Sequence, residues 1–83
     1  MKKFKVTFYT NVVYSTADSA DQDQFVRYYE VPDNWTADEV SKLVQKELEV
    51  NSFLKDESSF YSSLFYKSAD VTSFRVQEIK EEK

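Results

Sequence analysis

The stretch that decides the fold is Trp35–Asn51, with the sequence WTADEVSKLVQKELEVN. Thr36, followed three residues later by Glu39, forms a capping-box pattern, in which each side chain caps a backbone N–H of the other at a helix start. Trp35 stands directly before this cap and is placed to pack on Val40 as a hydrophobic staple. Both signals predict that a helix begins after Thr36.

The same stretch has the periodicity of an amphipathic helix. Its apolar residues recur three or four positions apart, which puts them on one helical face; they are Val40, Leu43, Val44 and Leu48. We therefore predict a helix over 37–50 that packs this stripe against a sheet. Asn51 is expected to follow it in the left-handed conformation.

Upstream of the helix, residues 3–14 alternate between apolar and polar side chains, as a half-buried strand does. The positions that share the apolar parity are Phe4, Val6, Phe8, Val12 and Tyr14. Thr10 interrupts this face, and Asn11 is a candidate for a β-bulge because asparagine tolerates unusual backbone angles. The polar residues 15–24 are predicted to form a loop.

A second strand is predicted over Gln24–Val31, where apolar residues occur at both parities. This pattern predicts an inner strand or a strand whose outer face is a contact surface. Downstream of the helix, residues 52–67 fit either a strand or a helical face, and their Ser-rich and aromatic composition favours a strand. A turn at 68–70 then leads into a last strand over Val71–Ile79, with Phe74 and Val76 facing inward.

These elements predict an α+β fold. A small, mostly antiparallel sheet of order β-β-α-β-β packs on one amphipathic helix. We expect a single domain over 1–83, with a solvated tail at 80–83.

The composition disfavours most catalytic chemistry, because the 83 residues include no Gly, no His and no Cys. Without His and Cys there is no side chain whose ordinary pKa lies near neutrality, and no thiolate nucleophile. Without Gly there is no phosphate-binding loop. The acids of the first loop do not have the spacing of a calcium-binding loop. We therefore expect a non-enzymatic protein with no metal and no cofactor.

The charge pattern points to a protein partner. The net charge is −4, so direct nucleic-acid binding is not expected. Residues 18–57 hold eleven carboxylates against four basic side chains, and such a section can face a basic partner surface. No apolar run is long enough to span a bilayer, so no membrane association is expected and a cytoplasmic location is predicted.

The predicted binding site lies around the second strand. Tyr rings bury a large area at low rotamer entropy and serve as interface anchors, and rim charges speed association. Two tyrosines are predicted as anchors and four acids as steering groups: Tyr28, Tyr29, Asp21, Asp23, Glu30 and Asp33.

In its size, acidity and lack of Cys and His, the chain resembles the small proteins that bacteriophages and mobile elements encode against host machinery, including anti-CRISPR inhibitors. This resemblance implies an inhibitor that blocks the basic, nucleic-acid-binding surface of a host protein. The alternative is a self-associating structural or accessory protein, because a domain this small gains stability from association and has strand edges available for it. A homodimer therefore stays open.

Overall fold

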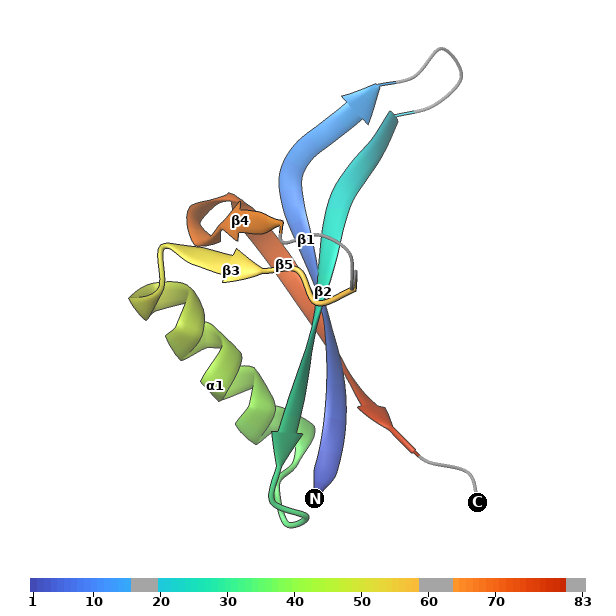
Figure 1. Ribbon diagram of the computed structural model, residues 1–83, viewed down its shortest axis with the longest axis vertical. Helices are drawn as coiled ribbons and strands as arrows, with labels where there is room; N and C mark the ends of the chain where they lie inside the picture. Colours follow the sequence, from blue (N-terminus) through green and yellow to red (C-terminus); the bar gives the residue numbers. More distant parts are fainter. Residues whose placement is uncertain (16–19, 59–63, 81–83) are drawn as a thin grey trace.

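The computed structural model describes residues 1–15, 20–58 and 64–80. These residues form an α-helix and two antiparallel sheets, one of three strands and one of two (Figure 1). In chain order the elements are β1 (Lys2–Ser15), β2 (Ala20–Val31), α1 (Ala37–Val50), β3 (Phe53–Lys55), β4 (Phe65–Lys67), the short 3-10 helix η1 (Ser68–Asp70) and β5 (Val71–Ile79). The predicted α+β class and β-β-α-β-β order are confirmed.

The larger sheet has the strand order β2-β1-β5, so β1 is its central strand. Phe4 lies opposite Tyr29 on β2 and opposite Glu78 on β5, and Phe8 lies opposite Phe25 and Phe74. The prediction of an inner position for the second strand is wrong, because β2 forms one edge. The apolar side chains of β2 that do not face the core instead point outward on the uncovered side of the sheet.

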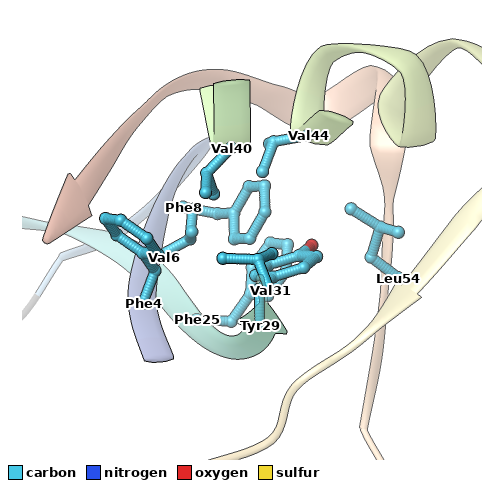
Figure 2. Packing of buried hydrophobic residues seen from close by; sticks show 9 residues of the cluster. All are labelled: Phe4, Val6, Phe8, Phe25, Tyr29, Val31, Val40, Val44 and Leu54. Carbon is cyan, nitrogen blue, oxygen red and sulfur yellow. The ribbon is translucent and has the colours of Figure 1, made fainter. Parts of the chain in front are cut away.

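One face of this sheet carries the core. Phe4, Val6 and Phe8 are nearly fully buried, as their alternation predicted. The nine buried hydrophobic residues come from four elements and pack in one cluster (Figure 2): Phe4, Val6, Phe8, Phe25, Tyr29, Val31, Val40, Val44 and Leu54. Phe74 and Val76 of β5 are half-buried against this cluster, as expected. The helix and the β3–β4 sheet therefore cover the same face.

The first hairpin is longer than its side chains predicted. The polar residues 15–24 were expected to be a loop, yet the backbone ladder continues through Val13 opposite Gln22 and Tyr14 opposite Asp21. Backbone hydrogen bonds need no apolar side chains, so a polar segment can extend a hairpin. The register shifts between Tyr9 and Val13, which confirms the irregularity expected around Asn11. Beyond Thr10, where pairing with β5 ends, β1 and β2 project from the rest of the molecule (Figure 1).

The helix has the predicted bounds, but both of its predicted caps are wrong. Thr36 is the N-cap residue, with φ −102° and ψ 171°, and its side chain makes no capping hydrogen bond. Thr36 and Glu39 are both exposed, so water can satisfy the first-turn N–H groups in place of the reciprocal cap. Asn51 is extended, with φ −101° and ψ 129°, and its N–H donates to the Glu47 carbonyl at 2.9 Å.

The buried stripe of α1 is centred on its valines. Val40 and Val44 have no exposed surface, whereas Leu43 and Leu48 are only partly buried against the core. Trp35 is also partly buried against the cluster that contains Val40, in agreement with the predicted staple. Within the described ranges, no helix combines the length and the apolar character that a membrane span requires.

Candidate functional site

The strongest candidate surface lies on the β3–β4 sheet. In this sheet Phe53 lies opposite Lys67, and Lys55 lies opposite Phe65. Residues directly opposite each other project to the same face, so these four side chains share one face, which we call the ribbon face. Phe53 is 54% exposed and Phe65 is 56% exposed. Two large rings thus lie in solvent on one small platform.

The opposite face of the same two strands fixes this platform to the core. Leu54 is 3% exposed and belongs to the core cluster. The ring of Tyr66 stacks on Phe25 at 4.4 Å between centroids, and Phe25 stacks on Phe8 at 4.6 Å. Three stacked rings therefore connect β4 through β2 to the central strand. The two exposed phenylalanines therefore lie on a pair of strands that is packed onto the core, and not on a free loop.

A cavity of about 460 Å³ borders the ribbon face, between the end of α1 and η1. It is lined by Leu48, Glu49, Asn51, Ser52, Phe53, Lys67, Ser68 and Ala69. The buried Ser68 shapes its floor, because its hydroxyl donates to the Asn51 carbonyl and its N–H donates to the Ser52 carbonyl at 2.9 Å. Phe53 and Lys67 therefore belong both to the ribbon face and to the rim of the cavity.

The ribbon face is cationic. Lys55 and Lys67 are exposed, and neither forms an ion pair with any of the described residues. Arg27 approaches the edge of β3, where its Nη1 donates to the Lys55 carbonyl at 3.0 Å, but it is itself paired with Glu57 at 3.7 Å. Apolar rings flanked by unpaired ammonium groups can bind a partner that presents carboxylates next to apolar side chains.

The two predicted anchor residues, Tyr28 and Tyr29, lie on opposite faces of β2. Tyr28 is 38% exposed on the uncovered face of the large sheet, with Lys3 Nζ 5.3 Å from its ring centroid. Tyr29 is 8% exposed in the core, and its hydroxyl donates to Glu47 Oε2 at 2.6 Å. Tyr29 is therefore a core residue and not an exposed anchor, because adjacent strand residues alternate in direction.

The four predicted steering acids do not form one patch. Glu30 is exposed on β2, and Asp33 is exposed in the following turn, where it pairs with the N-terminal amine at 3.2 Å. Asp23 lies toward the other end of β2, and its Oδ1 accepts the Gln24 N–H. Asp21 pairs with Tyr14 in the backbone ladder, and its side chain lies outside the described part. Glu30 is two residues from Tyr28 on β2, and Asp33 lies in the turn that follows the strand.

Sequence reasoning missed the ribbon face because it left residues 52–67 open between strand and helix. The described parts of that stretch are short strands, which confirms the favoured choice there, and 59–63 lie outside the description. A usable signal was present in the sequence. The triplets Phe53-Leu54-Lys55 and Phe65-Tyr66-Lys67 repeat one pattern, with an apolar centre between Phe and Lys.

Among the titratable groups of the described residues, the hydroxyl of Tyr29 is strongly perturbed. Burial raises the pKa of Tyr29 far above its ordinary value of 10.0, and the hydrogen bond to Glu47 raises it further. This group stabilises the core and does not line either candidate surface. The described residues contain no group of three or more His, Cys, Asp or Glu side chains that could hold a metal ion.

Comparisons with known protein families, curated proteins and solved structures give no match for this chain.

Proposed function

We propose that the protein is a non-enzymatic protein-binding module, and that it binds its partner through the ribbon face. The observation that carries this proposal is the placement of Phe53 and Phe65, more than half exposed, on one face of a sheet fixed to the core. Exposed aromatic side chains on a sheet that is packed onto the core can serve as anchors in a protein interface. The proposed compartment is the cytoplasm.

The two rings can supply much of the binding free energy. Covering the exposed halves of two phenylalanines removes roughly 200 Å² of apolar surface from water, which contributes on the order of 5 kcal/mol. Because the platform is already ordered, little conformational entropy is lost when a partner covers it. Lys55 and Lys67 add specificity for carboxylates and increase the association rate. The preferred partner is therefore a protein segment with acidic side chains beside apolar ones.

The test begins with the immobilised full chain as bait in a lysate of the source cells, followed by titration of each captured protein. Phe53→Ser and Phe65→Ser should each weaken binding by at least about tenfold, because each removes an anchor ring. Both residues are exposed, so the variants should keep the fold, which circular dichroism checks. Lys46→Ala, at an exposed position of α1, is the surface control and should bind like wild type.

Charge reversal gives the second arm of this test. Lys55→Glu with Lys67→Glu should slow association and reduce its dependence on salt, whereas the serine variants should mainly speed dissociation. Binding that is insensitive to all four substitutions would contradict a role for the ribbon face. Captured material that disappears after nuclease treatment would show that the chain binds nucleic acid instead.

A second candidate function follows from the sequence resemblance. In it, the chain is an inhibitor of the phage or mobile-element kind, and its partner is a host protein whose basic surface binds nucleic acid. What favours it is the exposed Tyr28 with Glu30 beside it on the strand and Asp33 in the next turn. Lys3 next to Tyr28 weakens the acidic character of this surface. Tyr28→Ala and Glu30→Lys should weaken binding only if this surface is used.

A further inference from the structure

The two edges of the large sheet differ, and the β2 edge is covered. The N–H of Val26 donates to Asp56 Oδ1 at 3.2 Å, and the Val26 carbonyl accepts the Glu57 N–H at 2.8 Å. The next outward N–H, that of Tyr28, donates to Glu57 Oε1 at 3.3 Å. Two consecutive acidic residues thus occupy the middle of this edge, where another strand would otherwise pair.

The orientation of the backbone along β5 follows from this geometry. Because Val26 and Tyr28 point away from β1, the odd-numbered residues of β2 point toward it. In β1 the residues that face β5 are then Lys3, Lys5, Thr7 and Tyr9, and their partners on β5 are also odd-numbered. From Ser73 to Ile79, where the register is regular, the even-numbered residues of β5 therefore direct their N–H and C=O groups to the outer edge.

No described segment pairs with this outer edge. Among the described residues, the backbone groups of Phe74, Val76 and Glu78 have no hydrogen-bond partner beyond the sheet. Natural sheets protect a long edge with proline, a bulge, charged side chains or a covering segment. In β5 the register shifts only near its start, and the regular stretch from Ser73 to Ile79 carries Arg75 and Glu78 but no proline. The β-branched and aromatic side chains of β5 favour extended backbone. In Figure 1 the C-terminal half of β5 diverges from α1.

We propose that a second copy of this chain pairs with the β5 edge, antiparallel and about a two-fold axis, to form one continuous six-stranded sheet. Two-fold pairing satisfies both open edges with one contact, since each copy offers the same strand to the other. This association does not depend on the ribbon face, which is a different surface.

The size of the exposed surface supports association. The chain exposes 6214 Å², whereas a compact monomer of its 9.8 kDa mass exposes roughly 5,200 Å². Its radius of gyration is 14.0 Å, against about 12 Å for a compact chain of this length. The projecting hairpin contributes to both values. A small domain that buries less of its surface than a compact chain gains stability from association.

Cross-strand charges disfavour one of the possible registers. A pairing centred on Arg75 would place this guanidinium opposite its own copy, which is destabilising. A pairing centred on Val76 places Arg75 opposite Gln77 of the second copy and Phe74 opposite Glu78. No like charges are then directly opposite within β5, so charge repulsion favours this register over the one centred on Arg75.

Concentration-dependent amide exchange tests the pairing in the unmodified protein. In dilute solution the N–H groups of Phe74, Val76 and Glu78 should exchange rapidly, whereas those of Ser73, Arg75 and Gln77 should be protected by β1. Raising the concentration from about 10 µM to 1 mM should slow the even-numbered set at least about tenfold and leave the odd-numbered set unchanged. Sedimentation should show the mass rising from 9.8 kDa toward twice that value.

A variant pair then assigns the contact to the edge. Glu78→Pro removes one outward N–H at a position where edge strands tolerate proline, and should weaken dimerisation about tenfold or more. Glu78→Ala also loses the ion pair with Lys2 at 3.3 Å but keeps the N–H, so it should dimerise like wild type. A chain that stays monomeric to 1 mM would overturn the proposal. So would a dimer equally stable in both variants, or one disrupted by Phe53→Ser.

Discussion

The hydroxyl of Tyr29 donates a 2.6 Å hydrogen bond to Glu47 Oε2, and this contact joins the edge strand β2 to the helix α1. Arg27 completes the group, because its Nε donates to the same hydroxyl at 3.2 Å and its guanidinium carbon lies 5.8 Å from the Tyr29 ring centroid. The side chain that sequence reasoning assigned to a partner surface thus stabilises the packing of helix on sheet.

Tyr29→Phe should lower the free energy of unfolding at pH 7 by about 1 to 2 kcal/mol, since it leaves the Glu47 carboxylate without this donor. The difference from wild type should shrink above pH 10. There the unfolded chain loses the Tyr29 proton while the folded chain, with its raised pKa, keeps it, so the wild-type contribution declines with pH. Urea denaturation at pH 7, 9 and 11 measures this. Parallel pH profiles for the two proteins would contradict it.

Val44→Ala should cost more stability than Leu43→Ala, although leucine is larger. Val44 is fully buried among core side chains, whereas Leu43 is partly exposed, so only the first change leaves a cavity. We expect about 2 kcal/mol for Val44→Ala and about 1 kcal/mol for Leu43→Ala. Denaturation midpoints at equal m-values give the comparison. The reverse order would mean that α1 is rotated about its axis relative to the structure described above.

Thr36→Ala should change stability by less than about 0.5 kcal/mol, because the Thr36 side chain makes no capping hydrogen bond. Glu39→Ala and the double variant complete a thermodynamic cycle, whose coupling energy should be near zero. The measurement is chemical denaturation of all four proteins. A coupling near 1 kcal/mol would restore the reciprocal cap that the sequence pattern predicted.

Asp56→Ala should destabilise the protein by about 1 to 2 kcal/mol and accelerate amide exchange at Val26. Its carboxylate accepts hydrogen bonds from the Val26 N–H and from the Ser58 N–H and hydroxyl. Loss of this carboxylate therefore weakens the attachment of the segment around Asp56 to β2. Asp33→Ala makes the same change of charge at a site 82% exposed and serves as the control. Unchanged exchange at Val26 would show that the carboxylate does not protect this edge.

Elements whose apolar residues recur at a regular spacing could be predicted from the sequence. The stripe of α1, the alternation of Phe4, Val6 and Phe8, and the strand Val71–Ile79 each match the structure, because burial on one face imposes a period on the chain. The extension of β1 and β2 through polar residues could not be predicted in this way. This extension depends on backbone hydrogen bonds, which do not require any pattern of apolar and polar side chains.

The candidate sites depend on the partner of each strand, which the local sequence does not encode. Tyr28 and Tyr29 are chemically alike in the sequence, and only the side on which α1 packs decides which ring is exposed. Phe53 and Phe65 were recognisable as large apolar residues, but short strands carry too few residues for a period to assign their faces. Their shared exposure follows from the register of β3 on β4.

Asp56 and Glu57, which pack against the edge of β2, also bear on how many copies of the chain could associate through their sheets. A sheet with two open edges behaves like a bifunctional monomer in polymer chemistry and can grow without end. In the proposed dimer, Asp56 and Glu57 occupy the middle of the β2 edge, so each copy would have a valence of one. Assembly through β5 would then stop at two chains, and loss of the acidic pair would convert a terminating unit into a propagating one.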